Sequence, residues 1–209
     1  VFVGMQCDAE IARHGARWRT SEWAEKLKAD ATWVQQAKDG FVRLLGAAGV
    51  VGAMPNIPAN RLCSQYDLQA MGFTVSAEEL SGVRALELAQ FALQRGEIDA
   101  AVVGAVDLSA EEVHLAATQA VLSADRQVGA DAAVVVVAKR LADALRDGDA
   151  VLAVLGGEPL SAEPGFLRLG DAADATSLAS RFGHAHAAKG LFHVAAATLC
   201  LAKRLQPGR

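Results

Sequence analysis

The chain has 209 residues, of which 52% are hydrophobic and 5% aromatic, and its formal net charge at pH 7 is −4. This length and apolar content are enough to build one large domain with a real core. The acidic balance argues against a nucleic-acid partner. No basic run would attract an anionic membrane, and no uncharged apolar stretch of 18 residues would cross one.

The elements expected from the sequence alternate between strands and helices. Strands are expected at 1–5, 99–106, 132–137 and 151–155, with another that ends in a sharp turn within 72–82. Helices are expected at 10–28, 30–48, 59–65, 83–94, 111–122, 141–146 and 185–205, and a loop at 158–174. The run 132–137 is apolar without a break, which is typical of a buried strand. Alternation of this kind predicts the α/β class.

The three cysteines predict neither a disulfide framework nor a zinc site. Cys7, Cys63 and Cys200 are an odd number and have no C-x-x-C spacing. They are interpreted as small buried side chains in a reducing compartment, which predicts a cytoplasmic protein. The chain begins with an apolar segment and no initiator methionine, so a fragment of a longer polypeptide is expected, with residues 1–209 forming one domain.

Six segments, taken in chain order, carry a resemblance. Residues 72–82 read GFTVSAEELSG and are followed by a helix, Gly96-Glu97 and a strand. This resembles the nucleophile elbow of β-ketoacyl synthases, which reads roughly T-V-D-T-A-C-S-S-S-L. The other five segments match family motifs in the same order: VFVG at 1–4, AMPNIPANRL at 53–62, VGADAAVVV at 128–136, KRLADALRDGD at 139–149 and FGHAHAAKG at 182–190. The resemblance implies a thiolase-like layered fold, truncated at the N-terminus.

The catalytic residues that the resemblance implies are incomplete. Glu79 stands where the family has its cysteine nucleophile, and a carboxylate cannot form the thioester that condensation needs. The family's first histidine lies in an H-G-T-G-T loop, but residues 165–171 contain none. Ala179 replaces a lysine, so His184 is the only family catalytic residue that remains. Glu79 either has a function of its own or is an inherited position that forms a salt bridge, and the second interpretation is preferred.

No metal site and no cofactor are predicted. His186 and His193 lie on the last expected helix and His184 stands at its start, but the spacing of the three does not place ligands at i and i+4 on one face. The glycine-rich segments lack the phosphate-loop spacing and its lysine. Glu78 and Glu79 are adjacent and would not face each other on a helix, so they are not read as a catalytic carboxylate pair.

The resemblance is greatest to chain-length-factor-like domains of bacterial polyunsaturated fatty acid synthases. It implies a non-catalytic subunit or domain that pairs with an active ketosynthase and meets acyl carrier protein. Two alternatives remain open: a decarboxylase of malonyl groups on carrier protein, with His184 stabilising the carbanion, and a structural remnant in a multidomain synthase. The resemblance also implies a dimer in which the strand at 99–106 meets a partner, so that a charge at Val103 would weaken the complex.

Overall fold

The computed structural model describes residues 1–6, 10–109, 112–156, 168–170 and 175–205. The chain divides into two compact units, one formed by Val1–Gln6 with Ala59–Arg209 and the other by Cys7–Pro58. Among the described helices, none has both the length and the apolar character needed to cross a bilayer.

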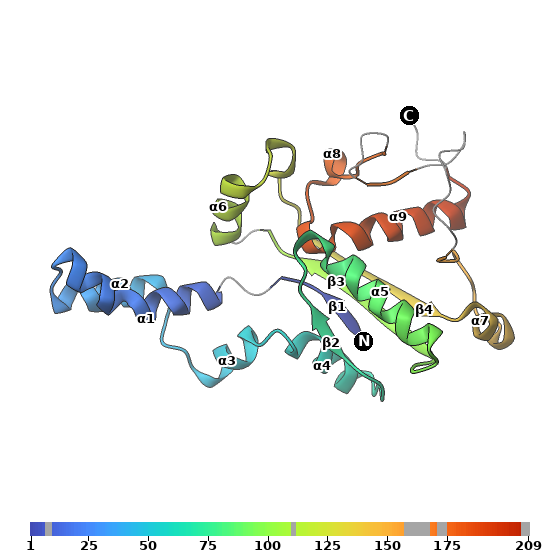
Figure 1. Cartoon of the computed structure of the whole chain (residues 1–209), viewed down its shortest axis with the longest axis horizontal. Coiled ribbons are helices and arrows are strands. Elements are labelled where there is room, and N and C mark those ends of the chain that lie inside the picture. The colour runs from blue at the N-terminus through green and yellow to red at the C-terminus, as the bar shows by residue number, and fades with distance from the viewer. Residues whose placement is uncertain (7–9, 110–111, 157–167, 171–174, 206–209) are drawn as a thin grey trace. The chain divides into compact units, whose positions relative to one another are not determined.

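The larger unit is built on a four-stranded mixed sheet with the order β2-β1-β3-β4 (Figure 1). Its strands are β1 (Phe2–Gly4), β2 (Phe73–Val75), β3 (Ala100–Asp107) and β4 (Ala132–Lys139). β1 runs parallel to β2 and to β3, whereas β4 is antiparallel to β3 over eight residue pairs. The α/β class expected from the sequence is confirmed.

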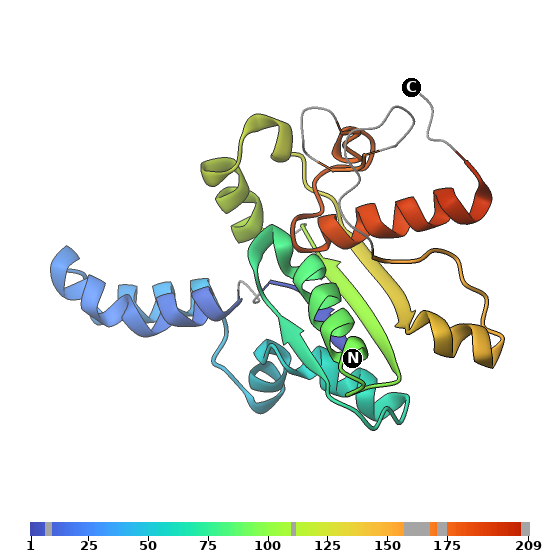
Figure 2. The same cartoon turned by 45° about the vertical axis from the view of Figure 1, so that its right-hand side comes forward.

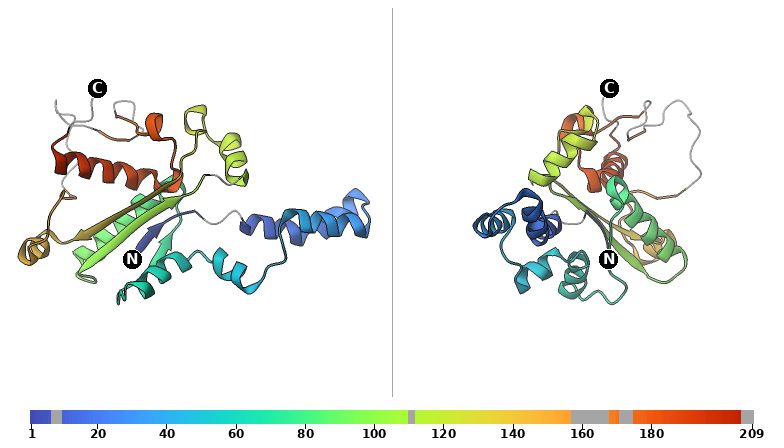
Figure 3. Two further views of the ribbon diagram at one scale, coloured as in Figure 1. Left: turned by 180° about the vertical axis from the view of Figure 1, so that it is seen from behind. Right: turned by 60° about the vertical axis from the view of Figure 1, so that its left-hand side comes forward.

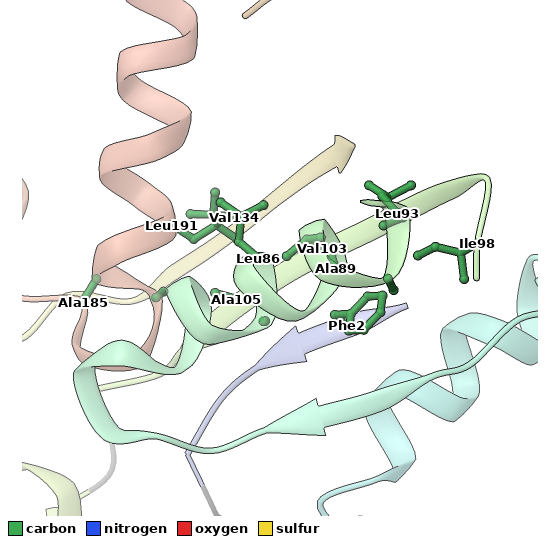
Figure 4. Close-up of a cluster of buried hydrophobic side chains, with 14 residues drawn as sticks. Phe2, Leu86, Ala89, Leu93, Ile98, Val103, Ala105, Val134, Ala185 and Leu191 are labelled. Atoms are coloured by element: carbon green, nitrogen blue, oxygen red, sulfur yellow. The ribbon is translucent and has the colours of Figure 1, made fainter. Parts of the chain in front are cut away.

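Helix α5 (Ser81–Gln94) lies across one face of this sheet, and α9 (Lys189–Lys203) packs beside it over β4 (Figure 2). Between them lies the main core, in which Leu86 and Ala89 of α5 face Val103 of β3 and Phe2 of β1 (Figure 4). Leu191 of α9 joins the same cluster and is fully buried. Burial of these side chains holds both helices on the sheet.

The opposite face of β1 contacts α4 (Ile57–Gln65). Side chains alternate along a strand, so Val1 and Val3 point away from Phe2 and pack with Ala59. Leu62 and Cys63 of the same helix pack against this second, smaller cluster. Seen from behind, β3 and β4 run side by side as the two longest strands (Figure 3).

Glycines allow α5 and α9 to begin close to the sheet and to each other. A methyl group on Gly4 would lie 2.5 Å from the backbone of Ser81 and Gly82, at the start of α5. A methyl group on Gly82 would lie 2.8 Å from the Cβ of Ala105, and one on Gly190 would collide with Val83. Small residues at these three places therefore bring the N-terminal ends of both helices together.

Short elements complete this unit. They are the 3₁₀ turns η1 (Glu78–Leu80), η2 (Ala124–Arg126) and η3 (His186–Ala188) and the helices α6 (Glu112–Val121), α7 (Leu141–Asp147) and α8 (Ala179–Phe182). The helix expected at 185–205 therefore begins as the turn η3 and continues as α9. α9 ends at Lys203, and Arg204, which follows it, has a left-handed backbone with φ of 51°.

The smaller unit consists of α1 (Glu10–Leu27), α2 (Ala31–Phe41) and α3 (Ala47–Ala53). α1 and α2 lie side by side, with the rings of Trp23 and Phe41 5.9 Å apart. The single helix expected at 30–48 is wrong: α2 ends at Phe41, and Val42 is extended. Nη1 of Arg17 donates to the Val42 carbonyl at 2.9 Å, which stabilises the chain outside the helix.

Two other expectations about strands are wrong. Residues 151–155 form no strand. No described strand pairs with them, so an extended backbone there would make no ladder hydrogen bonds. The strand expected to meet a partner is β3, whose two edges are already bonded to β1 and β4. Val103 is 0% exposed in the main core, so a charge there would disrupt folding before it affected any complex.

Candidate functional site

The site lies where η1 leads into α5, next to the start of α9. Ser81 is fully buried and fastens this turn, because its Oγ donates to the Glu78 carbonyl at 2.6 Å and accepts from the Ala77 amide at 2.9 Å. Glu78 itself has a left-handed backbone with φ of 52°, which is uncommon for a residue other than glycine. This sharp turn aims the side chain of Glu79 at the loop before α9.

Glu79 contacts three basic side chains. Nη1 of Arg126 donates to both carboxylate oxygens, at 3.1 and 3.2 Å. Nζ of Lys189 lies 3.8 Å from Oε2, and Nε2 of His184 lies 3.4 Å from Oε1. Lys189 is 7% exposed and Glu79 is half-buried, so these charges interact in surroundings that screen them less than water does.

His184 is held by the backbone around it. Its amide donates to the Val128 carbonyl at 2.7 Å, and its own carbonyl accepts from the Ala130 amide at 3.1 Å. Gly183 precedes it with φ of 81°, and a methyl group there would lie 2.9 Å from the Cβ of Ala130. Glycine is therefore required at this position, and it places the imidazole in the interior, 3% exposed.

The electrostatic surroundings favour a neutral His184. Burial lowers the pKa of His184 below its ordinary value, and the positive charge of Lys189 lowers the pKa further, against the opposing effect of Glu79. Neither ring nitrogen has a hydrogen-bond partner among the described residues. Such a side chain can accept a hydrogen bond or bind a ligand through either nitrogen, depending on its tautomer.

His186 begins a row of polar side chains next to His184. Nε2 of His186 lies 3.5 Å from Oε2 of Glu78, and the centres of the His186 and His184 rings are 5.9 Å apart. On the other side His186 stacks edge-on against His114, 5.8 Å between centres. Nε2 of His114 lies 3.9 Å from Oδ2 of Asp107, and burial raises the pKa of Asp107 above its usual range.

A cavity of about 400 Å³ opens beside Glu79 and Lys189. Its other lining residues are largely apolar, among them Leu80, Val83 and Val194. Apolar walls with a few converging charged groups are typical of small-molecule sites.

The structure brings together Glu79 and His184, the two site residues named from the sequence. Ala179 lies on α8, and of the interval 165–171 only Arg168, Leu169 and Gly170 belong to the described residues. Cys63 lies on α4 and Cys200 near the end of α9, and neither lines the cavity; Cys7 is outside the described part of the chain.

The sequence did not predict two residues of the site, Lys189 and Arg126. Lys189 lies in the segment FGHAHAAKG, and a charged residue among the small residues at the end of this segment was the available signal. Arg126 comes from a short turn with no recognisable motif, so nothing in its neighbourhood along the chain indicated a contact with Glu79.

The family model of the beta-ketoacyl synthase N-terminal domain matches residues 20–133, more than half of the chain. One component of the polyunsaturated fatty acid synthase of Thraustochytrium sp. is 30% identical over 118 residues, which cover 55% of this chain and 6% of that protein. The chain therefore spans only a small part of such curated relatives.

Solved structures of low sequence identity share the fold. The PfaC keto synthase–chain length factor has a TM-score of 0.66 at 17% identity, over 95% of this chain and 28% of that one. A type II polyketide synthase acyl-carrier protein in complex with its ketosynthase has a TM-score of 0.51 at 14% identity, over 75% and 43%. With the matched domain and the thiolase-like fold of these structures, the chain belongs to the β-ketoacyl synthase family.

Proposed function

We propose that this chain is a non-catalytic, chain-length-factor-like member of its family that pairs with an active ketosynthase in fatty acid or polyketide synthesis. The observation that carries the proposal is the ion-paired carboxylate of Glu79 in the turn η1 before α5, in the place where the family has its cysteine. We further propose that residues 1–209 act as one cytoplasmic domain of a larger synthase.

The chemistry of this position supports the proposal. Condensation needs a thiolate that attacks a thioester and then carries the acyl group as a new thioester. Glu79 offers no sulfur, and its two oxygens are engaged by Arg126 and lie close to Lys189 and His184. The interactions that hold the carboxylate make it a poor nucleophile, because each of them stabilises its negative charge where it is.

The partners follow from the proposed role. A family member without a nucleophile contributes to elongation only beside one that has it, so an active ketosynthase is the first partner. The growing chain in such synthases is bound to acyl carrier protein, which is the second. The relatives named above, a ketosynthase with a chain length factor and a ketosynthase with its carrier protein, support both partners in general terms.

The test uses the whole chain with the ketosynthase encoded in the same polypeptide or beside it. Malonyl- and acyl-loaded carrier proteins are supplied, and product lengths and the mass of each protein are measured. We expect acyl groups on the ketosynthase alone, a co-sedimenting complex, and a product distribution that changes when this chain is omitted. An acyl group on this chain, or unchanged products without it, would contradict the proposal; the second result would leave a structural remnant.

One observation favours a second function, a decarboxylase of malonyl groups on carrier protein. Lys189 lines the cavity, and it lies near the same carboxylate of Glu79 as His184, whose pKa is lowered. A bound carboxylate and a developing carbanion would require such a cation and such a neutral imidazole. Release of carbon dioxide from malonyl-loaded carrier protein by the isolated chain would support it. We expect no release above the rate without protein, and Lys189→Ala and His184→Gln show whether any release that occurs comes from this site.

A further inference from the structure

We propose that Glu79, His184 and His186 form a binding site for a divalent metal ion of the zinc type. One ligand atom from each of the three lies within 4.8 Å of the other two. They come from η1 and from the segment that leads into α9, so only the folded chain assembles them. The sequence predicted no metal site, because the spacing of the histidines alone does not suggest one. The third ligand, Glu79, lies about a hundred positions away along the chain.

Buried ring nitrogens without a partner point to a missing ligand. Both ring nitrogens of His184 lack a hydrogen-bond partner among the described residues, although the side chain is only 3% exposed. Nδ1 of His186 is likewise buried without such a partner. Buried polar atoms are seldom left in this way, since losing water without a replacement costs free energy. A metal ion between the rings and Glu79 would bind one nitrogen of each ring and so give a partner to one of the two unsatisfied nitrogens of His184.

The donor set selects the class of ion. Two imidazole nitrogens and one carboxylate oxygen suit zinc and its neighbours among the transition metals, whereas calcium and magnesium prefer oxygen ligands throughout. Three protein ligands also leave a fourth position open, which zinc fills with water or another small ligand. Of the three ligands, Glu79 borders the cavity described above.

Two cations compete with the metal for Glu79. Nη1 of Arg126 contacts both of its oxygens, and Nζ of Lys189 lies 3.8 Å from Oε2. A bound ion must share the carboxylate with these groups and bear their repulsion. Removing Lys189 should therefore strengthen metal binding, an effect that a merely adventitious surface site would not show. This inference does not depend on the proposed role in chain elongation.

The experiment titrates the chelator-stripped chain with Co²⁺, whose visible absorption reports ligand type and geometry, and then displaces it with Zn²⁺. We expect one ion per chain, a spectrum without cysteine-to-cobalt charge transfer, and a rise in the unfolding temperature with zinc. Glu79→Gln and His186→Ala should each weaken binding about tenfold or more. Lys189→Ala should tighten it about tenfold, equivalent to about 1.4 kcal/mol.

His14→Ala is the matched control, because His14 belongs to the smaller unit and is not among the three ligands. Circular dichroism tests whether each variant is folded. If Glu79→Gln does not fold, the metal affinity of His186→Ala tests the inference in its place. The inference is overturned if the chain binds no zinc at about 1 mM, a concentration typical of the weakest specific metal sites. A cobalt spectrum that shows sulfur ligands would also overturn it. So would an unchanged metal affinity in whichever of Glu79→Gln and His186→Ala is folded. A loss of metal affinity in both Lys189→Ala and His14→Ala would overturn it as well.

Discussion

Nη1 of Arg126 donates to both carboxylate oxygens of Glu79, at 3.1 and 3.2 Å, although 47 residues separate them along the chain. This contact ties the turn before α5 to the segment that leads into β4. Lys189, at the start of α9, approaches the same carboxylate from another element. One side chain therefore connects three parts of the larger unit at the position of the family's nucleophile.

Glu79→Gln should lower the free energy of unfolding by about 1–3 kcal/mol, because it removes the negative charge that faces Arg126 and the buried Lys189. A double-mutant cycle with Arg126→Gln should give a coupling energy of about 0.5–3 kcal/mol from denaturant unfolding. Glu87→Gln removes an exposed pair with Arg84 and should change stability by less than about 0.5 kcal/mol. Equal effects at Glu79 and Glu87 would show that the buried network adds nothing.

Acyl transfer to the chain should be undetectable, and Glu79→Cys should not restore condensation. The thiol would return, but the family's loop histidine and the lysine at position 179 would still be missing. Catalytic groups that act as a unit are not additive, so condensation in the single variant should stay ~10³-fold or more below an intact relative. Intact-mass measurement after exposure to an acyl thioester, and carrier-protein assays of the variant, check both statements. A rate approaching that of the intact enzyme would refute them.

The sequence predicted the central sheet well because its strands carry strong local signals. The apolar run of β4 and the turn-helix-strand unit from β2 through α5 to β3 each specify their own conformation. Residues 151–155 have the same apolar character, yet they form no strand, because strand formation depends on a neighbour that the local sequence does not reveal. The prediction that β3 meets a partner chain was wrong for the same reason. The strands that flank β3 are determined by the whole sheet and not by the local sequence.

The site was predictable only where a motif marked it. Glu79 and His184 could be located because each stands in a recognisable segment. The contacts that determine their behaviour come from Arg126 and Lys189, which lie on other elements and meet Glu79 only in the folded chain. Distances of this kind depend on the close approach of α5 and α9 that Gly82 and Gly190 permit, and no local pattern encodes it.

Gly4→Ala should destabilise the larger unit by about 1–3 kcal/mol or more, because the new methyl group would meet backbone atoms that cannot move independently. Gly104, which pairs with Val3 on the neighbouring strand, is the matched control. A methyl group there would lie 3.7 Å from its nearest neighbours, which is ordinary contact, so Gly104→Ala should cost less than about 1 kcal/mol. Thermal unfolding of the two variants compares them directly; equal losses would show that α5 does not press on β1.

Asp107→Asn should stabilise the chain at neutral pH, and the gain should shrink as the solution becomes acidic. Burial raises the pKa of Asp107, so folding favours its protonated form. The stability it contributes is full below the unfolded pKa and is lost as pH rises through the folded pKa. At pH 7 the wild-type chain therefore carries a buried charge that the amide lacks, with Oδ2 unpaired among the described hydrogen bonds.

Asp143→Asn should behave in the opposite way and serves as the control for this last prediction. The hydrogen bond from Arg140 lowers the pKa of Asp143, so its contribution is present above the unfolded pKa and is lost as pH falls through the folded pKa. The variant should be less stable than wild type at pH 7, and that difference should also shrink in acid. Denaturant unfolding of the three proteins from pH 8 down to about pH 2, well below the ordinary aspartate pKa of about 3.9, follows both trends: the gain of Asp107→Asn shrinks first, and the loss of Asp143→Asn shrinks only below about pH 4. Destabilisation by Asp107→Asn at pH 7 would mean that the buried carboxylate is bound by a cation or another partner that the neutral amide cannot hold.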